Sequence, residues 1–148
     1  LDASAVVKLV VDEPESETLR TFIDRADLVS CELILAEVPR AIRRAAARDE
    51  RLPLDVLIDR AGQTVDSLAL APLDRGLLLA AGALAEPVLR ALDAIHVAAA
   101  AALEPIEGFV TYDDRQAAAA RLAGMRTMSP VPGRFAGSAG REPVWARD

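Results

Sequence analysis

Short apolar runs alternate with longer helical patterns along this chain, and this alternation restricts its fold more than any other feature. The apolar runs with strand character cover residues 27–31, 67–73, 108–112 and 125–129. The segments with helical spacing or alanine-rich composition cover residues 3–16, 16–27, 32–51, 53–65, 74–86, 89–104 and 114–124. Strands that alternate with helices form parallel sheets. The sequence therefore predicts an α/β sandwich of three layers, with a short, mostly parallel central sheet and helices on both faces.

Prolines and a glycine set the expected helix boundaries. Pro39 lies inside the 32–51 segment, where its ring and missing N–H should kink the helix or reset its first turn. Pro53 suits the first turn of the next helix, and Gly124 suits the cap that ends the last one. Leu1 reads as the end of a shortened first strand, so we expect a few residues upstream of it.

The composition excludes several classes of protein. The 148 residues suit one domain, 1–130, followed by a tail rich in Gly, Pro and Arg at 131–148 that is either disordered or docks on a partner. The single cysteine, Cys31, excludes a disulfide framework or a Cys-rich zinc finger and suits the cytoplasm. No uncharged apolar run reaches the length of a membrane span. The net charge of −6 argues against a protein that coats nucleic acid, yet it permits an acidic site for divalent cations.

Three acidic residues stand where an α/β sheet places its functional groups, just beyond the carboxyl ends of strands, and Glu37 is a fourth candidate about one helical turn beyond a strand. Asp2 follows the shortened first strand, Asp113 follows 108–112, and Asp93 opens an alanine-rich helix. Each of these aspartates could instead cap a helix or complement its dipole. Glu37 lies among apolar neighbours, where an unpaired carboxylate is costly, so it needs an arginine, a proton or a metal as partner.

The joint appearance of these acids favours a metal site. If they converge at one edge of the sheet, two carboxylates about 4 Å apart repel by roughly 4 kcal/mol at an effective dielectric of 20. Oxygen ligands select hard ions such as Mg²⁺ or Mn²⁺, and carboxylate-bound Mg²⁺ is typical of phosphodiester hydrolysis. The chain has a single histidine and shows no Ser–His–Asp order typical of a nucleophilic site. It also lacks the Gly-rich loop of a P-loop phosphate-binding site.

Four segments in sequence resemble the PIN-domain ribonucleases, and most of all the VapC-type toxins of bacterial toxin–antitoxin pairs. They are LDASAVVKLV at the start, AEVPRAIRRA around Glu37, LRALDAIHVAAA around Asp93 and FVTYDDRQAAAA around Asp113. The resemblance runs from Leu1 to about Pro130. It implies a PIN-like sandwich and a Mg²⁺- or Mn²⁺-dependent endoribonuclease site.

The resemblance also implies roles for individual residues and partners. The acidic quartet is Asp2, Glu37, Asp93 and Asp113, which bind the metal and support catalysis. Ser4 and Thr111 match hydroxyl positions that support such a site, and we interpret Asp114 as a helix cap or a supporting acid. The family further implies a homodimer, inhibition by a cognate antitoxin, and RNA as substrate, often tRNA or ribosomal RNA.

His96 and an arginine stripe are the remaining candidates. His96 neighbours Asp93 on a helix, and the resemblance implies packing or hydrogen bonding for it rather than metal binding. Positions 37, 40, 44, 48 and 51 fall on one helical stripe, which is either a solvated face or a contact for RNA phosphates. Our hypothesis is that Arg40 or Arg44 contacts RNA, and an acidic antitoxin segment could use the same groove.

The leading hypothesis is thus a metal-dependent endoribonuclease toxin. The alternative is a catalytically weak or inactive PIN-like module that binds RNA or protein, and Pro39 is the one feature that favours it. A phosphatase with an aspartate after its first strand fits less well. Such enzymes usually have a second aspartate two residues on or a late lysine, whereas here Ser4 holds that position and the only lysine is Lys8.

Overall fold

The computed structural model describes residues 1–103 and 105–133 of the chain, and it contains the alternating helices and strands that the sequence predicts. The helices are α1 (Ala3–Val10), α2 (Ser16–Ile23), α3 (Ile34–Ala46), α4 (Leu54–Asp66), α5 (Arg75–Gly82), α6 (Ala91–Ala102) and α7 (Asp114–Leu122). The strands are β1 (Val29–Cys31), β2 (Ala69–Ala71), β3 (Phe109–Val110) and β4 (Thr127–Met128). Gly124 has φ 87°, a backbone conformation that suits glycine at the end of α7, as predicted.

The strands pair in parallel, β1 with β2 and β3 with β4, and the first two residues join the pairs. The amino group of Leu1 donates to the carbonyl of Val29 in β1 at 2.7 Å. On the other side, the backbone N–H of Asp2 donates to the carbonyl of Val110 in β3 at 3.1 Å. The start of the chain therefore lies between β1 and β3, where the sequence predicts a shortened strand.

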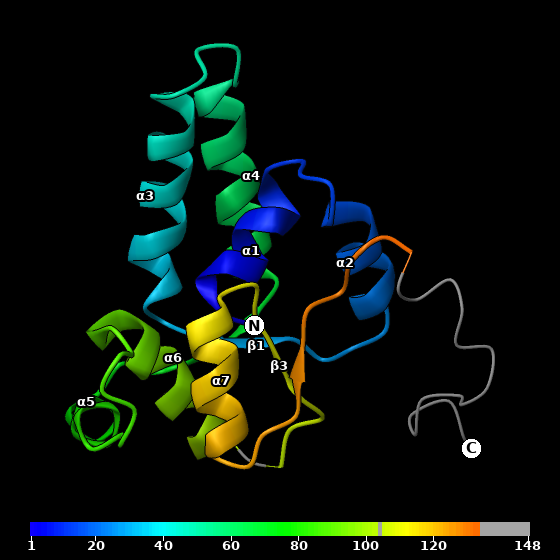
Figure 1. Ribbon diagram of the computed structural model, residues 1–148. Helices are drawn as coiled ribbons and strands as arrows, with labels where there is room; N and C mark the ends of the chain where they lie inside the picture. The colour runs from blue at the N-terminus through cyan, green and yellow to red at the C-terminus, as the bar shows by residue number, and fades with distance from the viewer. Residues whose placement is uncertain (104, 134–148) are drawn as a thin grey trace.

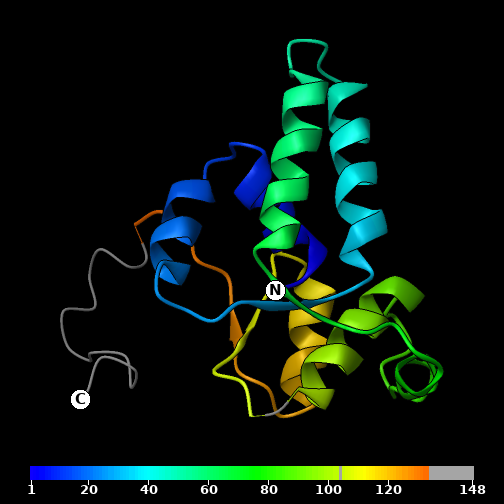
Figure 2. The same cartoon turned by 180° about the vertical axis from the view of Figure 1, so that it is seen from behind.

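Helices cover both faces of the strands, which confirms the three-layer sandwich (Figures 1 and 2). Phe109 packs with the buried residues of α6 and α7, whereas the next residue, Val110, packs with α1 and α2. Successive strand residues point to opposite faces, and both of these side chains are buried. A sheet buried on both sides explains why its strands are apolar runs without alternation.

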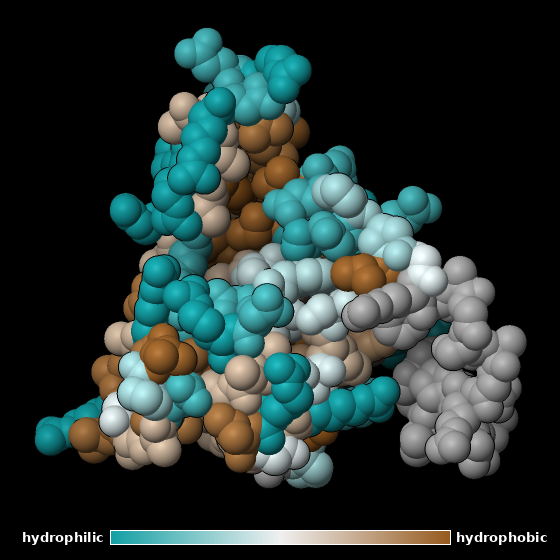
Figure 3. Space-filling model, in the orientation of Figure 1, coloured by the Kyte–Doolittle hydropathy of each residue, from teal (hydrophilic) through white to brown (hydrophobic). Residues whose placement is uncertain are grey.

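Helices α3 and α4 form a hairpin that projects from the rest of the molecule (Figures 1 and 2). Its seam is built from Val38, Ile42 and Leu57, which pack with α1. Hydrophobic surface shows over α4 on its side toward α1, and hydrophilic side chains cover the outer side of α3 (Figure 3). Helix α3 continues through Pro39. The N–H that proline lacks would bind the carbonyl of Leu35, an exposed residue, so water can replace this donor.

The prediction that the arginine stripe continues along one helix to position 51 is wrong, because α3 ends before it. The helix ends at Ala46, so Arg48 and Arg51 do not continue its face. The carboxylate of Asp49 accepts from the backbone N–H of Arg51 at 3.1 Å and from its guanidinium at 2.8 Å. Such a local side-chain turn competes with helix formation. The helical part of the stripe is therefore limited to positions 37, 40 and 44.

The boundary of the domain at residue 130 remains a prediction. Strand β4 completes the second strand pair, and the carbonyl of the buried Pro130 accepts from the hydroxyl of Tyr112 at 2.8 Å. Most of the predicted tail, residues 134–148 with Trp145, lies outside the described residues. Across residues 1–103 and 105–133, no helix has the length and apolar character needed to cross a lipid bilayer.

Candidate active site

Asp2 lies at the centre of a buried hydrogen-bond network. It is the N-cap of α1, and its carboxylate accepts from the backbone N–H of Ala5 at 2.9 Å. The hydroxyl of Ser4 donates to both carboxylate oxygens, at 2.7 and 2.9 Å, and the hydroxyl of Thr111 donates at 2.6 Å. Asp2 and Thr111 are both fully buried. The sequence reading of Asp2 as a helix cap is thus correct, and the same carboxylate also holds two hydroxyls.

The two hydroxyls extend this network to the start of α7. The Thr111 oxygen that donates to Asp2 also accepts from the backbone N–H of Asp113 at 3.0 Å. The Ser4 oxygen accepts from the backbone N–H of Tyr112 at 2.9 Å. As a result, the amino terminus of the chain lies beside the start of α7 (Figures 1 and 2).

Asp113 is the N-cap of α7 and is paired with a cation. Its carboxylate accepts from the backbone N–H groups of Arg115 and Gln116 at 2.8 and 3.2 Å. The guanidinium of Arg115 donates to Asp113 Oδ2 at 2.9 Å, and this hydrogen bond lowers the pKa of Asp113 below its ordinary value. Asp114, which begins α7, is exposed and has no side-chain partner among the described residues.

Asp93 stands in the first turn of α6 and is incompletely bonded. Its Oδ1 accepts from Nε2 of Gln116 at 3.1 Å. Its Oδ2 is buried without a hydrogen-bond partner among the described residues, and Arg115 Nη2 lies 3.9 Å from it. Burial raises the pKa of Asp93, and the nearby charge of Asp113 raises it further. The structure therefore places two carboxylates close enough to repel each other.

Glu37, on α3, contacts His96 on α6. Its Oε2 lies 2.7 Å from Nε2 of His96, and His96 Nδ1 lies 3.5 Å from the sulfur of Cys31. Burial disfavours the protonated imidazole, but its hydrogen bonds to Cys31 and Glu37 outweigh that effect and raise the pKa of His96 to about 9. His96 is thus a hydrogen-bonding residue that carries a positive charge at neutral pH.

The three aspartates lie in one continuous hydrogen-bond network. Glu37 contacts His96, which lies on α6 about one turn beyond Asp93. Each of the four carboxylates already has a protein partner: hydroxyls for Asp2, Arg115 for Asp113, Gln116 for Asp93 and His96 for Glu37. Within the described ranges, no three His, Cys, Asp or Glu side chains are arranged to hold a metal ion. The donor set still fits a hard cation, because it is built of oxygens and leaves Asp93 Oδ2 without a partner.

Comparison with known proteins identifies the family. The PIN-domain family model matches residues 1–122, which include all four acids. Ribonuclease VapC46 of Mycobacterium tuberculosis is 41% identical over 138 residues, which cover 88% of this chain and 95% of that protein. The chain belongs to the VapC-type PIN-domain family. Ribonucleases VapC47 and VapC35 of the same species are 33% and 37% identical, with the same coverage of each chain. No solved structure matches significantly.

In this VapC-type PIN domain, three residues that sequence analysis missed contact the acidic network. Arg115 pairs with Asp113, Gln116 donates to Asp93, and Cys31 contacts His96. The sequence holds a signal for one of them, because an N-cap aspartate followed three residues later by glutamine is typical of a capping box. It holds none for Cys31, whose contact with His96 depends on how α6 packs on β1.

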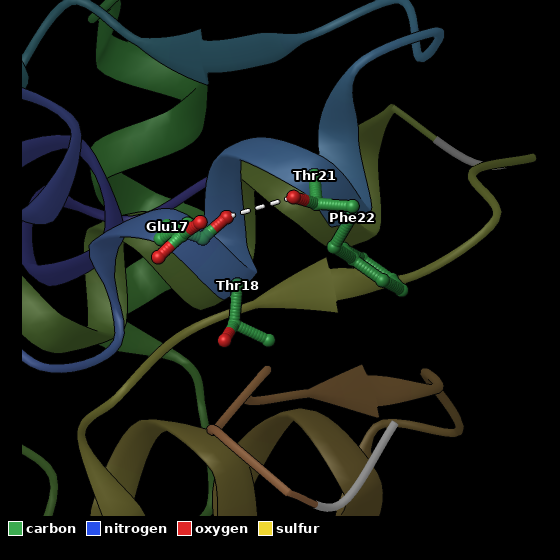
Figure 4. Close-up of a pocket in the computed structure, with 4 residues that line it drawn as sticks. All are labelled: Glu17, Thr18, Thr21 and Phe22. Carbon is green, nitrogen blue, oxygen red and sulfur yellow. Dashed lines mark hydrogen bonds between the residues drawn. The ribbon is translucent and has the colours of Figure 1, made fainter. Parts of the chain in front are cut away.

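Two hollows in the described part of this PIN domain lie away from the acids. One of about 190 Å³ lies along α3 and is lined by Arg40, Arg43, Arg44 and Ala47. Among the described residues, these arginines have no carboxylate partner, and all three are exposed. A second, of about 300 Å³, is lined by α2 residues (Figure 4), where the hydroxyl of Thr21 donates to the carbonyl of Glu17 at 3.0 Å. Its lining lacks paired titratable groups, so we assign no chemistry to it.

Proposed function

We propose that the chain is a Mg²⁺- or Mn²⁺-dependent endoribonuclease toxin. The observation that supports it most is the network of Asp2, Asp93 and Asp113, in which a buried oxygen of Asp93 has no donor among residues 1–103 and 105–133. Three relatives that match most of the chain are named ribonucleases. A carboxylate network with a free buried oxygen suits a cation, and cations promote phosphodiester hydrolysis.

Asp93, Asp113, Asp2 and Glu37 are the residues that would hold the metal. A divalent ion bound there would supply positive charge to offset the charge that develops on the phosphate oxygens during hydrolysis. Thr111 and Ser4 fix the orientation of Asp2, and Arg115 pairs with Asp113 and offsets its charge.

The histidine contributes by holding Glu37 in place rather than by moving protons. An imidazole whose pKa is raised to about 9 keeps its proton at neutral pH, so it cannot serve as a general base there. Its Nε2 lies 2.7 Å from Glu37 Oε2 and fixes that carboxylate oxygen. Hydrolysis in this site therefore depends on the acids and their cation.

Removing divalent ions is expected to abolish RNA cleavage. Protein treated with EDTA and then dialysed should leave a mixed RNA substrate intact, and added Mg²⁺ or Mn²⁺ should restore cleavage. The measurement is the rate at which RNA fragments appear on a denaturing gel.

The alternative, a PIN-like binding module, is favoured by the protein partners that Asp113 and Glu37 already have. RNA retained in a binding assay but left uncut at millimolar Mg²⁺ and Mn²⁺ would support that module instead.

Removing the charges of Arg40 and Arg44 together is expected to weaken RNA binding. Each phosphate contact on single-stranded RNA contributes about −0.7 to the slope of log K against log salt, so the slope should become shallower by about 1.4. Binding is measured by fluorescence anisotropy from 50 to 300 mM salt, with the doubly substituted R40Q/R44Q protein. Arg75→Gln on α5 is the control, because that arginine is also exposed. An unchanged slope would remove the α3 surface from the RNA-binding site.

The remaining parts of the proposal concern partners and location. The family relation supports a cognate antitoxin that neutralises the toxin, a homodimer, and action on RNA in the cytoplasm. An acidic antitoxin segment would compete with RNA for Arg40 and Arg44. Co-expression with the product of an adjacent reading frame, followed by purification and size measurement, tests the antitoxin and the dimer together.

A further inference from the structure

The first turn of α7 contains a capping box of which only half is formed. In a complete box the N-cap side chain binds the N–H of the third helical residue, whose own side chain returns to the N–H of the cap. Here Asp113 does accept from the backbone N–H of Gln116. The N–H of Asp113, however, donates to Thr111 at 3.0 Å, so the glutamine side chain is not needed there.

The side chain of Gln116 turns instead into the acidic network. Gln116 is only 5% exposed, and its Nε2 donates to Asp93 Oδ1 at 3.1 Å. A carboxylate can only accept hydrogen bonds, so this contact fixes which end of the amide faces Asp93. The amide oxygen, Oε1, must then point elsewhere within the buried site.

Two buried side-chain atoms lack a hydrogen-bond partner in the described part of the chain, and they belong to this one pair of residues. They are Asp93 Oδ2 and Gln116 Oε1. Both are acceptors, so a single group that donates, or a cation, can satisfy them together. Arg115 does not, because its Nη2 lies 3.9 Å from Asp93 Oδ2, beyond hydrogen-bond distance. Unpaired buried acceptors are costly, and their occurrence on two residues joined by a hydrogen bond points to a ligand.

We propose that Gln116 is a further residue of the cation site. Its Oε1 contributes a neutral oxygen ligand to the divalent ion, directly or through a bound water, and its Nε2 holds Asp93 so that Oδ2 faces the same ion. Glutamine oxygens are suitable ligands for hard cations. A neutral ligand also adds an oxygen without adding to the repulsion among the aspartates. This inference rests on the proposed metal-dependent function.

The test is Mn²⁺ binding to the protein alone, measured by electron paramagnetic resonance of free Mn²⁺ and by the rise in melting temperature. Gln116→Leu should weaken Mn²⁺ affinity by about 10-fold or more, in line with losses at groups that support metal ligands. Gln116→Glu keeps an oxygen ligand but loses the Nε2 donor to Asp93, so its affinity should lie between those of Gln116→Leu and the unsubstituted protein. The control is Gln63→Leu, because Gln63 is the other glutamine and lies exposed on α4.

The outcomes separate this inference from the function on which it rests. Unchanged affinity in Gln116→Leu overturns it, and so does equal weakening in both Gln116 variants, which would indicate a structural role only. If Gln116→Leu does not fold, Gln116→Met, an apolar side chain of similar length, takes its place in the comparison with Gln116→Glu. Failure of the unsubstituted protein to bind Mn²⁺ overturns both this inference and the metal-dependent function, whereas binding with an unchanged Gln116→Leu overturns the inference alone.

Discussion

Replacing Asp93 with asparagine is expected to lower RNA cleavage by about 10²- to 10³-fold, because electrostatic stabilisation by a metal ion is worth several kcal/mol in the transition state. The substitution keeps the size of the side chain and its acceptor for Gln116, so the site stays assembled. What it removes is the charge that would hold the cation. Cleavage is measured under single-turnover conditions at fixed Mg²⁺ concentration.

The same substitution is expected to stabilise the folded protein when divalent ions are absent. Burial and the charge of Asp113 raise the pKa of Asp93, so the folded state disfavours the charged form of this carboxyl group. Asparagine removes this charge, and its amide can donate to the unpaired oxygen of Gln116. The free energy of unfolding should rise by about 1 kcal/mol, as measured by urea denaturation in EDTA.

Opposite effects on activity and stability distinguish a functional carboxylate from a structural one. The matched control is Asp59→Asn on α4, an exposed aspartate, which should change neither quantity measurably. Full cleavage activity in Asp93→Asn would remove Asp93 from the metal site. A loss of stability would instead show that the charge of Asp93 supports the fold.

The sequence predicts most of this fold because its signals are local. Phe109 and Val110 are both apolar, which is typical of a strand buried on two faces, and they pack on opposite layers. The predicted stripe from Arg40 to Arg51 was wrong beyond α3, because helical periodicity does not show that Asp49 forms a local turn. The periodicity of charged residues alone could not show that α3 ends at Ala46.

For the candidate site too, the sequence indicates the positions of the acidic residues but not their partners. Strand ends and helix starts indicate where Asp2, Asp93 and Asp113 lie, and the structure links these three residues in one network. Their function as metal ligands stays a prediction. The partners of these acids are set by packing between elements far apart in the chain, such as the contact of Glu37 on α3 with His96 on α6. No spacing in a single sequence encodes such a choice of partner.

Asp2→Ala is expected to have the largest effect on stability. The substitution removes an acceptor from the hydroxyls of Ser4 and Thr111 and from the N–H of Ala5. Because Thr111 is fully buried, water cannot replace the lost partner. Hydrogen bonds to a charged group contribute about 1.5–3 kcal/mol each, so the three donors together imply a loss of at least about 4.5 kcal/mol. For a chain of this size, the melting temperature should fall by roughly 10 °C.

The control for this prediction is another N-cap aspartate that lies on the surface. Asp74 caps α5 by accepting from the N–H of Leu77 at 2.8 Å, and it is exposed. Asp74→Ala should therefore cost only about 1 kcal/mol, the usual value of a cap. Both variants are compared by thermal and urea unfolding in EDTA, so that metal binding makes no difference. Equal losses would mean that Asp2 acts only as a cap of α1, and its hydroxyl partners would then contribute nothing to the stability of the site.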